Sequence, residues 1–136
     1  MKPSEVRQNV LAEHARLCEK LTLLETVAWA VRGGDESEVG RLRLRARDLC
    51  QSVFVHLAAE DELLLPLLRG VDAGGQVLAD QVQKDHSTQR GALLDLQHKA
   101  DHAEAWNLAE AALVFAKSLR ADMAQEERDS LGKVGG

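Results

Sequence analysis

The chain has 136 residues, a formal net charge of −5 at neutral pH, and a composition that is 45% hydrophobic but only 3% aromatic. This length suffices for one domain with a single core, and the acidic balance without a basic stripe argues against a nucleic-acid partner. No apolar run is long enough to span a membrane and no signal peptide precedes the first helical pattern, so we expect a cytoplasmic protein in which Cys18 and Cys50 stay reduced.

Four helical segments follow one another with short connections. Alanine and leucine recur with the period of an α-helix, and clusters of β-branched residues between turn signals are missing. The predicted helices cover residues 4–32, 36–69, 75–100 and 103–131. Long helices with short connections predict an all-α, up-down-up-down antiparallel four-helix bundle that forms a single domain over residues 1–136.

Capping residues and helix breakers set the limits of these segments. Ser4 is a good N-cap for the first helix. Pro66 is expected to kink or end the second helix, and the glycine-rich residues 70–75 to form the loop that follows. Gly91 interrupts the third helix at a cost of about 1 kcal/mol relative to alanine, which suggests a packing reason or a local bend. We expect residues 133–136 to fray.

The second helix carries the central motif, His56-x-x-x-Glu60. Residues four apart lie on one face of a helix, one turn apart, so both side chains can reach the same point. That face is the apolar seam of the helix. The predicted seam comprises Leu42, Ala46, Leu49, Val53, His56, Glu60, Leu63 and Leu67. Burying ionisable groups is costly unless a partner compensates them, and a metal cation can satisfy both.

Polar residues interrupt the apolar seams of the other helices as well. His14 lies in the seam of the first helix, His86 and Gln89 in the third, and Asp122 and Glu126 in the fourth. In an up-down-up-down bundle, the ionisable residues all lie roughly 10–20 Å from one common end, at about 1.5 Å rise per residue. Taken singly, each has an ordinary interpretation as a hydrogen-bonded core histidine or a solvated acidic face. Together they predict a metal site.

The two halves of the chain repeat the pattern. The first half has His14 and then the central motif, and the second has His86 and then Asp122-x-x-x-Glu126. This arrangement is typical of a duplicated helical hairpin that supplies two sets of ligands to two metal ions. Imidazole and carboxylate ligands without thiolate favour iron, manganese or zinc.

At this point the sequence resembles the hemerythrin-like family, the HHE cation-binding domain, over nearly the whole chain. The family pattern is histidine, His-x-x-x-Glu, histidine and His-x-x-x-Glu on successive helices. The matching residues are His14, His56, Glu60, His86 and Glu126. The resemblance implies a non-haem di-iron centre in which Glu60 and Glu126 bridge the two irons. It also implies binding or sensing of a small oxidant or gas (dioxygen, peroxide or nitric oxide), or iron handling.

The chain departs from the family pattern at two positions. Asp122 stands where the fourth helix usually supplies a histidine, and Arg90 stands one turn after His86, where oxygen-carrying members have a second histidine. Fewer nitrogen ligands argue against a reversible oxygen carrier and leave a coordination site open to small ligands. The predicted metal ligands are His14, His56, Glu60, His86, Asp122 and Glu126.

Two other functions stay open at this stage. One is a di-iron redox enzyme that turns over peroxide or nitric oxide at the same centre, so the sequence does not decide whether the protein is an enzyme. The other is a metal-depleted bundle that acts through protein contacts, for example as a homodimer. Asp122 is the residue that favours this second alternative.

Overall fold

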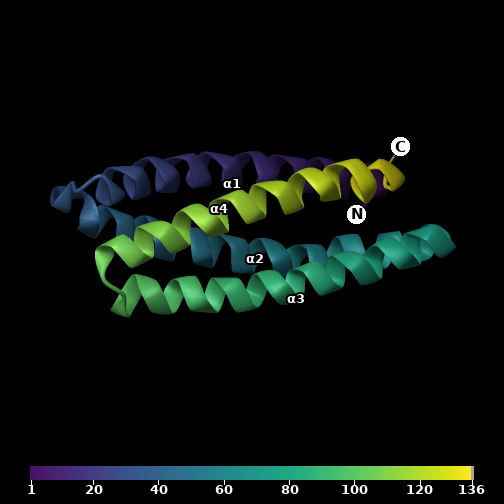
Figure 1. The fold of residues 1–136 in the computed structure, drawn as a ribbon. Helices are drawn as coiled ribbons and strands as arrows, with labels where there is room; N and C mark the ends of the chain where they lie inside the picture. Colours follow the sequence, from purple (N-terminus) through teal and green to yellow (C-terminus); the bar gives the residue numbers. More distant parts are fainter. Residues whose placement is uncertain (136) are drawn as a thin grey trace.

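The computed structural model describes residues 1–135, and these form four long helices. They are α1 (Pro3–Arg32), α2 (Val39–Val71), α3 (Ala73–His102) and α4 (Ala105–Asp129), with 3₁₀ turns η1 (Glu36–Glu38) and η2 (Leu131–Lys133). The helices lie side by side and alternate in direction, so both chain ends lie at one end of the molecule (Figure 1). No strand occurs in this described part, and the predicted all-α four-helix bundle is confirmed.

The apolar core consists of two clusters with a polar layer between them. The larger cluster includes Leu21, Leu24, Leu49, Leu93 and Leu108 and fills the end of the bundle that holds η1. The smaller cluster lies at the end that holds both chain termini. Its buried members are Val6, Val10, Leu64, Leu65, Leu68, Ala79, Val82, Leu131 and Val134. Along α1, α2 and α3 the polar seam residues fall between members of the two clusters, and on α4 they lie between the larger cluster and Leu131 of η2, so they share one level of the bundle.

The predicted seam of the second helix is right as far as Glu60 and wrong beyond it. Leu63 is 37% exposed and Leu67 only half-buried, whereas Leu64 and Leu68 are fully buried. The prediction alternated steps of three and four residues, which has a period of 3.5. A straight helix has 3.6 residues per turn, so the predicted stripe drifts around the helix by about 20° per heptad.

Both chain ends differ from the prediction. Helix α1 begins at Pro3, where a proline is suited because its missing N–H has no partner in the first turn, so Ser4 is not the N-cap. The C-terminal residues pack instead of fraying. Val134 is only 2% exposed, and the Lys133 Nζ atom lies 2.9 Å from an Asp72 carboxylate oxygen. Gly136 lies outside the described residues.

The connection between α2 and α3 is tighter than the glycine-rich loop expected over residues 70–75. Helix α2 continues through the exposed Pro66 to Val71, and Asp72 alone separates it from α3. The Asp72 carboxylate caps α3 by accepting a hydrogen bond from the Gly75 N–H at 2.6 Å. A Cβ atom on Gly75 would lie 2.1 Å from the Leu68 carbonyl oxygen, so this turn requires glycine.

We expect opposite effects from alanine at two helical glycines. Gly75→Ala should lower the free energy of unfolding by about 1–3 kcal/mol, because the added methyl group forces the two helix ends apart. Gly91 has open space around its missing Cβ, so the expected packing reason is absent there. Gly91→Ala should therefore raise the free energy of unfolding by roughly 0.5–1 kcal/mol. Urea denaturation followed by circular dichroism measures both, and destabilisation by Gly91→Ala would contradict this account.

Candidate metal centre

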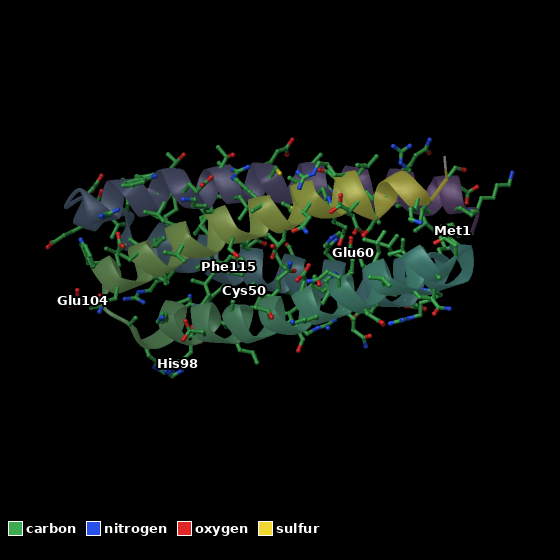
Figure 2. The ribbon with its side chains drawn as sticks, turned by 45° about the vertical axis from the view of Figure 1, so that its right-hand side comes forward. Met1, Cys50, Glu60, His98, Glu104 and Phe115 are labelled. Atoms are coloured by element: carbon green, nitrogen blue, oxygen red, sulfur yellow. The ribbon has the colours of Figure 1, made fainter. Side chains whose placement is uncertain are left out.

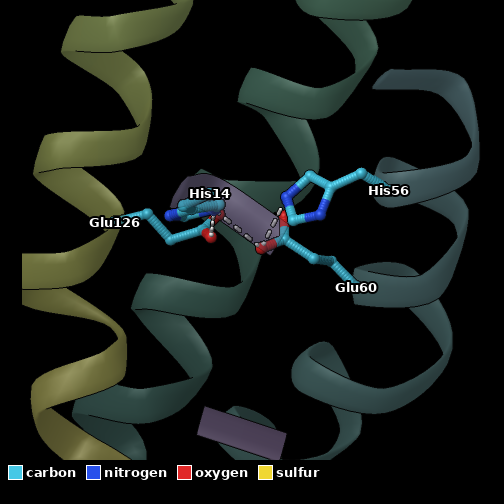
Figure 3. Close-up of side chains that lie close together, drawn as sticks. All are labelled: His14, His56, Glu60 and Glu126. Atoms are coloured by element: carbon cyan, nitrogen blue, oxygen red, sulfur yellow. Dashed lines mark ion pairs between the residues drawn. The ribbon is translucent and has the colours of Figure 1, made fainter. Parts of the chain in front are cut away.

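Five ionisable side chains from all four helices meet in the polar layer. His14 comes from α1, His56 and Glu60 from α2, His86 from α3 and Glu126 from α4. None of the first four is more than 4% exposed, and the Glu126 side chain is 10% exposed. Figure 2 shows Glu60 inside the bundle, toward the end at which Met1 lies, and Figure 3 shows four of the side chains pointing toward one another.

Each glutamate of this cluster presents its two oxygens to different imidazoles. The Oε2 atom of Glu60 lies 3.5 Å from the His14 Nε2 and 3.2 Å from the His56 Nε2, while its Oε1 lies 2.9 Å from the His86 Nε2. Glu126 places Oε1 at 3.2 Å from the His14 Nε2 and Oε2 at 3.7 Å from the His86 Nε2. Both carboxylates therefore extend between the histidine of α1 and the histidine of α3.

The donor atoms of this cluster fit a metal ion. One ligand atom from each of His14, His56, Glu60 and Glu126 lies within 4.8 Å of the others. Within residues 1–135, the Nε2 atoms of His14 and His86, the Oε2 of Glu60 and the Oε1 of Glu126 are buried, and none of them makes a hydrogen bond of suitable geometry. An unpaired buried polar atom costs about 1–3 kcal/mol, and a cation bound here would satisfy all four. The cluster can therefore hold a metal ion.

A second set of carboxylates lies against the opposite nitrogens of the rings. The Nδ1 atom of His56 lies 2.5 Å from a Glu13 carboxylate oxygen, and the Nδ1 of His86 lies 2.7 Å from an Asp61 oxygen. When Nδ1 carries the proton and donates it to the carboxylate, Nε2 keeps its lone pair free for a metal. These contacts orient both imidazoles toward the centre of the cluster.

Sequence reasoning missed these outer carboxylates. A third, Glu127, lies 3.6 Å from the Nδ1 of His14, although its segment resembles a solvated acidic face. Each outer acid directly precedes or follows a cluster residue in the sequence but contacts a histidine of a different helix. An acidic neighbour directly beside His14, Glu60 and Glu126 was the available signal. Only the packing of the helices shows which histidine each acid meets.

The two positions that depart from the family pattern lie beside the cluster. The Asp122 Oδ2 accepts a hydrogen bond from the Gln89 Nε2 at 2.9 Å, and Asp122 lines a cavity of about 30 Å³ together with His86 and Glu126. Arg90 pairs with Asp61. Of the six predicted ligands, five therefore converge in the metal-free geometry, and Asp122 borders them.

Burial and the carboxylates act in opposite directions on the histidines. Burial lowers the pKa of His14, but Glu126 and Glu60 outweigh it and raise that pKa from 6.5 to about 10. His86 has its pKa raised to about 10 in the same way, with Asp61 contributing. Burial raises the pKa of Glu60, but its interactions with Glu126 and the histidines hold it well below the ordinary value. At neutral pH these imidazoles carry protons that a metal ion must displace.

Comparison with known families identifies the chain. A family model described as the hemerythrin HHE cation binding domain matches residues 6–134, a span that contains every residue of the cluster. Searches of curated proteins and of solved structures found no match. The matched span, the four-helix bundle and the buried histidine–glutamate cluster agree, and the chain belongs to the hemerythrin HHE cation-binding domain family.

Proposed function

We propose that the protein binds two iron ions in a non-haem dinuclear centre. His14 and His56 would hold one ion, His86 and Asp122 the other, and Glu60 and Glu126 would bridge them. The observation that carries this proposal is the orientation of the two glutamates, each of which presents one oxygen toward His14 and the other toward His86. Manganese or zinc would suit the same donors.

The chain's own residues would serve such a centre in two ways. Glu13 and Asp61 hold the imidazole rings with Nε2 directed inward. The two apolar clusters close the polar layer on both sides, which keeps water away and strengthens the electrostatic interactions inside. When bound, the ions would supply a coordination site for a small ligand such as dioxygen, peroxide or nitric oxide.

A bundle that no longer binds metal is less consistent with this interior. Five ionisable side chains would then be buried together with mainly one another and the outer carboxylates as partners, which is a costly arrangement. Turnover of peroxide or nitric oxide at the centre stays a second proposal and needs kinetic evidence.

The remaining sequence predictions concern location and partners. No helix within residues 1–135 is long and apolar enough to cross a bilayer. The cytoplasmic location, the absence of a nucleic-acid partner and the homodimer stay predictions.

We expect about two iron ions per chain after expression in iron-replete medium, measured by elemental analysis. His56→Ala should lose at least one ion because it removes one of the four ligand atoms that lie within 4.8 Å of one another. Asp122→Ala should retain about one ion, and Asp122→His should retain both.

The matched control is His102→Ala, because His102 is an exposed histidine at the end of α3. This variant should keep the wild-type metal content. Less than one ion per wild-type chain, or equal losses in His56→Ala and His102→Ala, would contradict the proposal.

We also expect the metal-free protein to become less stable as the pH rises from 7 to 10. The folded-state pKa of His14 is about 10 against an ordinary value of 6.5. The stabilisation from its proton is therefore complete below pH 6.5, decreases as the unfolded chain loses that proton, and is gone once the pH passes the folded-state value. The free energy of unfolding should fall by roughly 1 kcal/mol per pH unit for each proton that the folded state binds and the unfolded state does not. Urea denaturation at several pH values tests this, and the slope should be smaller in His14→Gln. A flat profile in the wild type would contradict the assignment.

A further inference from the structure

A groove of about 540 Å³ lies between α3 and α4, outside the histidine–glutamate cluster. Its apolar lining consists mainly of Ala92, Leu96, Ala111, Phe115 and Leu119. Pockets that bind small organic molecules have about this size and are mostly apolar, with a few polar groups that fix orientation. The groove therefore has the dimensions and the lining of a small-molecule site.

Two polar residues, Gln89 and Asp122, lie at the end of the groove nearest the histidine–glutamate cluster. The Gln89 Nε2 donates to the Asp122 Oδ2 at 2.9 Å. A carboxylate only accepts hydrogen bonds, so the amide nitrogen must be the atom that faces Asp122. Gln89 is 9% exposed, and its Oε1 is buried without a hydrogen-bond partner among the described residues. This oxygen is an acceptor in need of a donor.

The same pair also borders the histidine–glutamate cluster. Gln89 and Asp122 line the groove on one side and, on the other, the small cavity that contains His86 and Glu126. Because a carboxylate has two oxygens, Asp122 can accept from Gln89 with one and face the cavity with the other. A molecule in the groove would thus place its polar end beside the histidine–glutamate cluster.

The negative charge of Asp122 at this end of the groove disfavours anionic ligands. Elsewhere along the groove the charges are paired, since the Lys99 Nζ lies 2.8 Å from Asp95 and the Arg32 Nε lies 2.7 Å from Glu110. The partner of Asp122 is a neutral amide. In the absence of metal, an anionic head group here would meet a carboxylate paired only with a neutral amide, whereas an O–H or N–H group would find two acceptors.

We propose that the α3–α4 groove binds a small organic molecule with an apolar body and an uncharged or cationic head that donates hydrogen bonds to Gln89 and Asp122. Alcohols, amines and organic hydroperoxides share this chemistry. The proposal goes beyond metal binding. The groove shares Asp122 with the proposed metal centre, so binding is tested both with the metal and without it.

The test uses three probes with the same eight-carbon body: 1-octanol, octylammonium and octanoate. Their binding to the full-length protein, as purified and after metal removal by a chelator, is measured by calorimetry and by NMR shifts. The alcohol and the ammonium ion should bind at least about tenfold more tightly than the carboxylate. The largest shifts should fall on groove residues such as Ala111 and Leu119. Because binding is also measured without metal, the groove and the metal centre can fail independently.

Two substitutions separate the apolar and the polar contributions. Ala92→Trp fills the groove from its exposed rim and should abolish binding, whereas Leu94→Trp on the same helix is exposed and outside the groove, and should have no effect. Gln89→Leu removes the acceptor and should weaken binding of 1-octanol about tenfold without excluding the apolar body. Octanoate binding as tightly as 1-octanol, or shifts confined to residues outside the groove, would overturn the proposal even if Ala92→Trp fails to fold.

Discussion

The burial of Glu60 and Glu126 is the constraint on which the rest of the bundle depends. Carboxylates in an apolar interior need partners, and here the partners are histidines from three helices. All four helices must therefore bring a polar residue to one level, which sets how far each helix is displaced along the bundle axis. The apolar core is divided in two as a result, and each part closes one side of the polar layer.

A ring of contacts around this layer ties the helices together in pairs. Three pairs are joined by a carboxylate and a histidine, and the fourth by an amide and a carboxylate. The contacts are Glu13 to His56 for α1 and α2, Asp61 to His86 for α2 and α3, Glu127 to His14 for α4 and α1, and Gln89 to Asp122 for α3 and α4. The amide–carboxylate contact between α3 and α4 is the one that contains Asp122, the residue that departs from the family pattern.

That departure and the groove occur on the same side of the bundle. Asp122 stands where the family usually has histidine, and it faces Gln89 across the α3–α4 interface at the end of the groove. An amide–carboxylate pair is polar and carries a negative charge, whereas a histidine ligand would be neutral when bound to metal. The residue that departs from the family pattern thus changes the chemistry of the surface next to the histidine–glutamate cluster.

Helical periodicity and chain direction were enough to predict the four helices, the α2 seam as far as Glu60, and one common level for the polar seam residues His14, His56, Glu60, His86 and Glu126. The contacts of the outer carboxylates, the pairing of Asp122 with Gln89 and the approach of Gly75 to α2 could be found only from the packed bundle. These features depend on the rotation of each helix and on which residue of its neighbour it meets. Local sequence does not encode that relation, because it arises when the whole core packs.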